Sequence, residues 1–99
     1  MENKNTTCEN SIERRLVNEV ERVGGWCLKL PAIHNAGLPD RLCLFPGGEV
    51  VFVELKAFGK KPRKIQTLMH QKLKAMGFRV EVIDTTMGCK MLVLEYDRK

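Results

Sequence analysis

A glutamate and a lysine lie inside the most apolar segment of the chain. Residues 50–58 read V-V-F-V-E-L-K-A-F, and unpaired charges are costly in such surroundings. Side chains alternate along a strand, so Glu54 and Lys56 would leave one face while Val53 and Leu55 enter a core on the other. Both charged side chains therefore lie on the same face of the predicted strand.

Asp40 stands at the start of the preceding apolar segment, directly after a proline. If residues 40–45 and 49–58 form a hairpin whose turn centres on Gly47, Asp40 lies directly opposite Glu54, with Cβ atoms about 5 Å apart. Carboxylates placed in this way repel each other and require a shared proton or a bound cation. Oxygen ligands of this type suit Mg²⁺ or Mn²⁺, which complete their coordination with water and substrate phosphate. The pattern therefore indicates phosphodiester hydrolysis.

Such hydrolysis needs a metal that polarises the phosphoryl oxygen and acidifies a water, and a fixed cation that orients the water or stabilises charge. Asp40 and Glu54 would hold the metal, and the backbone carbonyl of Leu55 could serve as a further ligand. Lys56 would provide the cation. The plainer alternative is a surface ion pair between Glu54 and Lys56, with Asp40 merely starting a strand. Each dipeptide taken alone favours that alternative.

Together these residues form the pattern P-D…E-x-K, which resembles the PD-(D/E)xK nuclease superfamily. The stretch G-L-P-D-R at residues 37–41, followed by V-V-F-V-E-L-K and then Gln66, resembles more specifically the VRR-Nuc (virus-type replication-repair nuclease) family. The resemblance covers about residues 12–84. It implies an α/β restriction-endonuclease-like fold and a Mg²⁺- or Mn²⁺-dependent endonuclease. It also implies a homodimer selective for branched DNA, as in Holliday junction resolvases, and a phage origin would fit.

The family pattern also has a glutamate on its first helix and a glutamine on its second. Glu13 matches the glutamate best and would be a metal ligand, whereas Glu19 and Glu21 are weaker candidates. A capping box with Asn10 at the helix start is the alternative for Glu13. Gln66 matches the glutamine and would hydrogen-bond an active-site carboxylate or a water. Without the resemblance, Gln66 would be an ordinary exposed helix residue.

Basic residues next to this pattern could contact DNA phosphates, helped by a net charge of +5. Arg41 directly follows Asp40, and His34 lies in the preceding loop. Solvated side chains are the plainer interpretation, above all for His34. The remaining candidates follow the E-x-K segment and would line a path for phosphates: Lys60, Lys61, Arg63 and Lys64.

Spacing of apolar residues and turn signals predicts the elements that must position these groups. We expect helices over about residues 10–23 and 65–76, and strands over 25–31, 40–45, 49–58 and 78–84. Residues 91–96 could add one more strand at an edge. The order α-β-β-β-α-β predicts a mixed sheet flanked by helices. The second helix carries an apolar stripe: Ile65, Leu68, Met69, Leu73 and Met76. His70 lies on the same helix, and no candidate catalytic or metal-binding residues stand beside it in the sequence.

The 99 residues give room for one domain, which we place at residues 10–99 after a flexible segment at 1–9. The four cysteines lack zinc-finger spacing and are expected to be reduced and mostly buried. No apolar run could span a membrane, and the polar start lacks a signal peptide's apolar stretch. We therefore expect a cytoplasmic protein, in the host cytoplasm if it is phage-encoded.

Three other functions compete with a junction-selective endonuclease. A flap or restriction-type nuclease would share the active-site residues and differ in substrate. A catalytically silent DNA-binding module would keep only the basic face, which the retention of Asp40, Glu54 and Lys56 argues against. An ordinary structural α/β protein would leave the repulsion between Asp40 and Glu54 unexplained.

Overall fold

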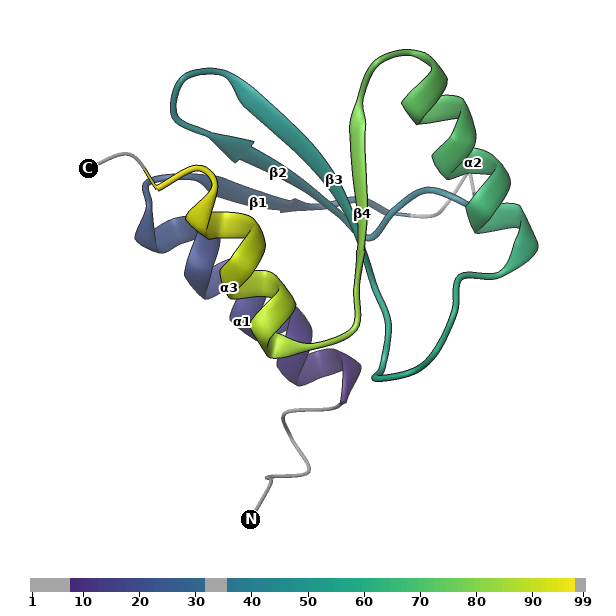
Figure 1. Ribbon diagram of the computed structural model, residues 1–99, viewed down its shortest axis with the longest axis horizontal. Helices are drawn as coiled ribbons and strands as arrows, with labels where there is room; N and C mark the ends of the chain where they lie inside the picture. Colours follow the sequence, from purple (N-terminus) through teal and green to yellow (C-terminus); the bar gives the residue numbers. More distant parts are fainter. Residues whose placement is uncertain (1–7, 32–35, 98–99) are drawn as a thin grey trace.

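The computed structural model describes residues 8–31 and 36–97 (Figure 1). Its elements follow the predicted order and end in an additional helix. They are α1 (Glu9–Arg22), β1 (Trp26–Lys29), β2 (Arg41–Phe45), β3 (Glu49–Leu55), α2 (Lys64–Ala75), β4 (Arg79–Ile83) and α3 (Thr86–Leu94). His34 and residues 1–7 lie outside the described residues, so neither the role of His34 nor the flexible start of the chain is tested.

The four strands form one mixed sheet in the order β1-β2-β3-β4. The first three strands are antiparallel neighbours, and β4 runs parallel to β3. In the β2–β3 hairpin, Arg41 lies opposite Val53 and Phe45 lies opposite Glu49. This register is the one predicted for a turn centred on Gly47. The φ of Gly47 is +95°, a backbone conformation that glycine adopts without strain.

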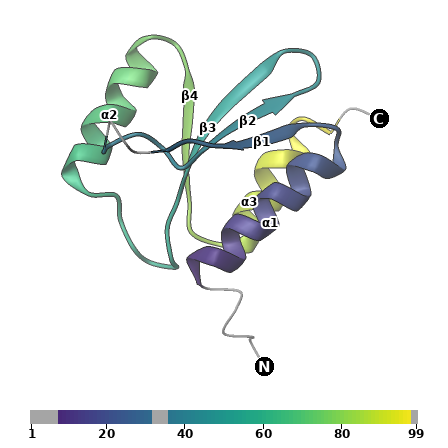
Figure 2. The same cartoon turned by 180° about the vertical axis from the view of Figure 1, so that it is seen from behind.

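Helices α1 and α3 pack against each other and cover one face of the sheet (Figures 1 and 2). The hydrophobic core lies between them and the strands. It combines buried side chains of α1 (Ile12, Leu16, Val20), α3 (Cys89, Leu92, Val93) and the sheet (Cys27, Cys43, Phe45, Val51, Val53, Leu55, Ile83). All four cysteines are free thiols and three are buried, as predicted.

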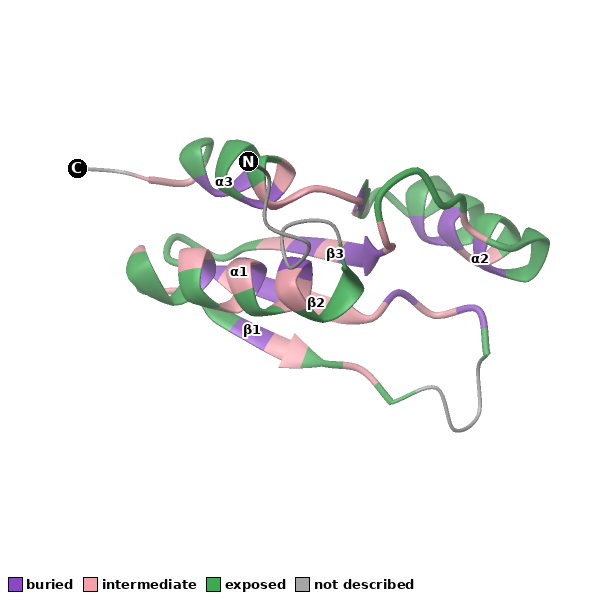
Figure 3. Cartoon of the chain, turned by 90° about the horizontal axis from the view of Figure 1, so that it is seen from below, coloured by how far each residue is buried: buried purple, intermediate pink, exposed green. Residues whose placement is uncertain are grey.

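Helix α2 lies on the other side of the sheet and packs against β4 (Figures 1 and 2). Its buried residues are Gln66, His70 and Leu73. Of the apolar stripe expected on this helix, Leu73 is buried and Met69 is half-buried. The other members, Ile65, Leu68 and Met76, are 48%, 55% and 59% exposed. Figure 3 shows that most of α2 is exposed, with short buried stretches, whereas the end of β3 is buried. The hydrogen bond between Gln66 and Glu54 joins these two elements. The contact face of α2 is therefore largely polar.

Two further expectations are corrected. Residues 91–96 form no strand: Thr86–Leu94 is helix α3, whose start is capped by a hydrogen bond from the Gly88 N–H to Thr85 Oγ1 at 2.9 Å. The capping box between Asn10 and Glu13 is also wrong, because α1 begins at Glu9 with Cys8 in the cap position. No helix among the described residues is long and apolar enough to cross a membrane.

Candidate active site

Glu54 is a carboxylate buried at the end of β3, with only 1% of its surface exposed. The neighbouring Val53 and Leu55 enter the core beneath α1 and α3, so strand alternation directs Glu54 to the α2 side, as predicted. Its Oε2 accepts a hydrogen bond from Gln66 Nε2 at 2.8 Å and lies 3.3 Å from Lys56 Nζ. Its Oε1 is buried without a hydrogen-bond partner among the described residues.

Asp40 precedes β2 at the position that the hairpin register sets opposite Glu54. Its Oδ2 accepts a hydrogen bond from the Leu55 N–H at 2.8 Å, which fixes the carboxylate beside the end of β3. Burial raises the pKa of Glu54, and the negative charge of Asp40 raises it further, against the opposing effects of Lys56 and Gln66. The two carboxylates therefore repel each other, and a cation between them would relieve that repulsion.

Gln66 links the start of α2 to Glu54. Its Oε1 accepts a hydrogen bond from the Arg63 N–H at 2.8 Å, which satisfies a backbone donor at the helix terminus. The amide nitrogen must then point the other way, toward Glu54. The expectation that Gln66 hydrogen-bonds an active-site carboxylate is met in this geometry.

His70 belongs to the same neighbourhood, although its position in the sequence gave no reason to expect it. It follows Gln66 by one helical turn on the buried face of α2 and is 6% exposed. Burial lowers the pKa of His70, the charges of Lys74 and Lys56 lower it further, and Asp40 raises it. Its electrostatic partners thus include two site residues from other segments. The i, i+4 spacing from Gln66 was the signal in the sequence that could have found it.

Glu13 is placed apart from the carboxylate pair. Its Oε2 lies 2.9 Å from Nη2 and Nε of Arg41, and Arg41 also donates to the backbone carbonyl of Cys27 at 3.0 Å. Arg41 stands opposite Val53 in the register, so its side chain leaves the sheet on the face covered by α1. The structure therefore joins Glu13 to Arg41 and leaves both on the face opposite Glu54.

The other basic candidates lie on the segment between β3 and α2 and at the first residue of α2. Lys60 and Lys61 lie on the segment that leads from β3 into α2, and Arg63 and Lys64 lie at the start of α2. All four are exposed, and none forms an ion pair within residues 8–31 and 36–97. Their side chains are therefore available to an anionic ligand.

The donors at Asp40 and Glu54 fit a divalent ion that keeps part of its water shell. Within the described part of the chain, no three His, Cys, Asp or Glu side chains converge as a complete metal site. Two carboxylates and the Leu55 carbonyl would leave the remaining positions to water and phosphate, the arrangement that Mg²⁺ favours. The buried, unpartnered Glu54 Oε1 is the atom that such an ion would satisfy.

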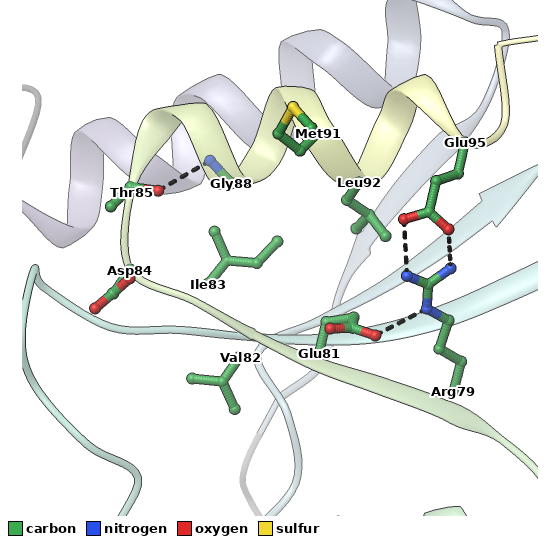
Figure 4. Close-up of a pocket in the computed structure, with 10 residues that line it drawn as sticks. All are labelled: Arg79, Glu81, Val82, Ile83, Asp84, Thr85, Gly88, Met91, Leu92 and Glu95. Atoms are coloured by element: carbon green, nitrogen blue, oxygen red, sulfur yellow. Dashed lines mark hydrogen bonds and ion pairs between the residues drawn. The ribbon is translucent and has the colours of Figure 1, made fainter.

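A separate hollow lies between β4 and α3 (Figure 4). Its charged groups all have partners, because Arg79 bonds Glu81 at 2.9 Å and Glu95 at 2.8 Å, and Asp84 accepts a hydrogen bond from the Gly59 N–H at 3.1 Å. The side chains of Val82 and Met91 flank it. This hollow therefore lacks the unsatisfied carboxylate oxygen that distinguishes the site at Glu54.

Comparisons with known proteins agree with this geometry. No model of a known protein family matches the chain. A protein named "Putative nuclease p44", from Acyrthosiphon pisum secondary endosymbiont phage 1, is 44% identical over 77 residues, which are 78% of this chain and 83% of that protein. A solved structure described as "VRR_NUC domain" superposes with a TM-score of 0.81 at 28% identity, covering 89% of this chain and 96% of that one. With the hairpin, the carboxylate pair and Gln66 in these positions, the chain belongs to the VRR-Nuc family of nucleases.

Proposed function

We propose that this chain is a divalent-metal-dependent endonuclease that hydrolyses phosphodiester bonds of branched DNA. The observation that carries the proposal is the state of Glu54: one carboxylate oxygen is held by Gln66 and Lys56, and the other is buried without a partner among the described residues. The negative charge of Asp40 acts on the same carboxylate. Such an arrangement costs stability in the metal-free protein. It is understandable as a site prepared for a cation.

Asp40, Glu54 and the Leu55 carbonyl would hold Mg²⁺ or Mn²⁺. The ion, when bound, polarises a phosphoryl oxygen and lowers the pKa of a coordinated water. Lys56 would orient the attacking water or stabilise charge that develops on the phosphate, since its ammonium already lies at Glu54. Gln66 would keep Glu54 in one rotamer, so that little reorganisation is needed during the reaction.

Glu13 is proposed as a further ligand only if its side chain leaves Arg41 and moves toward Asp40, because the Glu13–Arg41 pair lies on the face of the sheet opposite Glu54. Its ion pair with Arg41 would then have to open when metal and DNA bind, which would free Arg41 for a phosphate. The variant Glu13→Gln separates the two states: a loss of metal affinity supports ligation, and unchanged affinity would assign Glu13 to the ion pair alone.

DNA would reach the site across its basic rim. The exposed residues Lys60, Lys61, Arg63 and Lys64 follow directly on the strand that carries Glu54, so their charges stand where phosphates flank the scissile bond. Arg41 and His34 are proposed to add phosphate contacts. Replacing Lys60 and Lys61 by glutamine should weaken DNA binding and reduce its salt dependence, with little effect on the rate at which bound DNA is cleaved.

The second partner that we propose is another copy of the chain, because a two-fold dimer suits two cuts in a four-way junction. Strand β4 is an edge of the sheet, and exposed apolar side chains lie on it and on α3: Val82, Met87, Met91 and Leu94. Two such edges would pair antiparallel about a two-fold axis. Sedimentation of the wild type and Met91→Glu tests this, with a dimer expected only for the wild type.

The testing experiment is cleavage of labelled four-way junction, flap, duplex and single-stranded DNA, each with Mg²⁺, Mn²⁺ or EDTA. Paired, metal-dependent nicks in the junction are expected, and Asp40→Asn serves as the inactive control. If the protein cleaves flap or duplex DNA faster than the junction, it is a flap or restriction-type nuclease and not a junction-resolving one. Binding without cutting on every substrate would favour the silent DNA-binding module. For a phage-type relationship such as that to p44, the site of action would be the host cytoplasm.

A further inference from the structure

Two buried side-chain atoms among the described residues lack a hydrogen-bond partner; one belongs to Glu54, and the other to the α2 face that bonds Glu54 through Gln66. They are Glu54 Oε1 and His70 Nε2. Buried polar atoms without partners are rare in folded proteins, and bound water or an ion usually accounts for them. The proposed metal accounts for Glu54. It does not by itself account for His70.

His70 lies on the buried face of α2. It shares the buried face of this helix with Gln66, whose amide holds Glu54. The charges of Lys56, from the end of β3, and of Asp40, from the segment before β2, both act on the imidazole. His70 is therefore near enough to the charges of both segments to be affected by them, and it is not part of the hydrophobic core.

Helix α2 is also held directly against the segment that carries Asp40. A Cβ atom at Gly37 would lie 2.6 Å from the Ile65 carbonyl oxygen and 3.2 Å from Met69 Cβ, so only glycine allows this close approach. The helix therefore fixes both carboxylates, Asp40 through the packing of Gly37 and Glu54 through Gln66. His70 lies on the helix that performs both tasks.

We propose that His70 is a positioning residue of the nuclease site, whose Nε2 hydrogen-bonds an ordered water in the hydration shell of the divalent ion at Asp40 and Glu54. The proposal rests on the proposed function. Contact through water is favoured over direct ligation because His70, Asp40 and Glu54 do not converge as a three-ligand set within the described residues. Mg²⁺ and Mn²⁺ retain several waters, and protein groups that hold such waters tune metal affinity.

The test is the affinity for Mn²⁺ without DNA, measured by titration calorimetry on the full chain. His70→Leu and His70→Asn should weaken binding about 10- to 100-fold, the usual effect of losing an outer partner of a metal site. His70→Gln should restore most of it, because its amide reaches the position of Nε2 while that of asparagine does not. Gln71→Leu, an exposed neighbour on α2, is the matched control and should bind as the wild type does.

Two results would overturn the inference. One is Mn²⁺ affinity equal to that of the wild type in all three His70 variants. The other is a ¹⁴N coupling in the electron paramagnetic resonance of bound Mn²⁺ that disappears in His70→Leu, which would make His70 a direct ligand. A wild-type protein that binds no Mn²⁺ would refute the metal site itself, so the two failures are distinguishable.

Folding of the variants is checked by their melting temperatures in EDTA. His70→Leu removes a buried atom without a hydrogen-bond partner, so its melting temperature should equal or exceed that of the wild type. If this variant melts below the assay temperature, the contrast between His70→Gln and His70→Asn decides alone. The inference is supported if His70→Gln binds Mn²⁺ more tightly than His70→Asn does. It is contradicted if the two variants bind Mn²⁺ equally.

Discussion

The two faces of the sheet are built on different principles. Beneath α1 and α3, the buried residues are almost entirely apolar and close to fully buried, as at Leu16 and Val53. Beneath α2, the buried residues include Glu54, Gln66 and His70. One face therefore supplies hydrophobic stabilisation, and the other buries polar groups, which lowers stability and which we propose serves metal binding. The position of a helix in this small chain does not by itself reveal whether it serves the core or the site.

Strand β3 joins the two faces. Val53 and Leu55 point into the core, while Glu54 and Lys56 meet on the other side. A slip of one residue against β2 would send both charges into the core, so the hydrophobic pattern that folds the hairpin also sets the geometry of the site.

Removing a carboxylate should have the largest effect on function and little effect on binding. Asp40→Ala and Glu54→Ala are expected to slow single-turnover cleavage roughly 10³-fold or more, about 4 kcal/mol of activation free energy. Lys56→Ala should likewise slow chemistry more than binding. Junction DNA binding in EDTA, measured by fluorescence anisotropy, should stay within about threefold of wild type for these variants, and retained turnover in both carboxylate variants would rule out the site.

A substitution in the core beneath α1 and α3 should lower stability and leave cleavage unchanged. Leu16 is fully buried, and Leu16→Ala should lower the free energy of unfolding by about 3 kcal/mol through lost burial and a cavity. Urea denaturation measures this loss. Cleavage per folded molecule should be unchanged, and a large loss of activity in the folded fraction would show that the two faces are not separable.

The link between α2 and Glu54 should matter less than the carboxylates. Gln66→Leu removes the hydrogen bond to Glu54 Oε2 and is expected to reduce cleavage about 10- to 100-fold. The exposed Gln71→Leu should leave cleavage unchanged. Equal rates for Gln66→Leu and wild type would mean that Glu54 is positioned without α2.

The smallest effect concerns the stability of the metal-free protein. Because the pKa of Glu54 is raised in the folded state by burial and Asp40, the folded protein keeps this proton to higher pH than the unfolded chain does. The associated stability is present below the ordinary carboxyl pKa and is lost as pH rises through the raised value. Glu54→Gln cannot ionise and should therefore unfold at a higher temperature than wild type at neutral pH in EDTA. The difference should shrink in acid.

The sequence was sufficient for the sheet and for the carboxylate pair. The alternation in residues 50–58 and the Gly47 turn determine the hairpin register, and that register places Asp40 at Glu54. These are local features, since period-two patterning and turn chemistry act over a few residues.

The role of α2 and the identity of α3 could not be predicted in the same way. Ile65, Leu68 and Met76 are spaced as the apolar stripe of a helix, but they are exposed. Helix α2 instead packs against β4 and bonds Glu54 through Gln66, and periodicity does not encode such long-range contacts. His70 was overlooked although its i, i+4 spacing from Gln66 places both residues on one face of α2. The short segment Thr86–Leu94 is apolar nearly all round, and such runs do not distinguish strand from helix without their caps.

The most direct test of a prepared metal site is the change in melting temperature that Mn²⁺ causes in the absence of DNA. Ligand binding to the folded state alone stabilises it in proportion to the logarithm of ligand concentration. Mn²⁺ should raise the melting temperature of the wild type and leave that of Glu54→Gln unchanged. An equal rise in both proteins, or no rise in the wild type, would contradict the assignment of Glu54 and its polar face as a metal site.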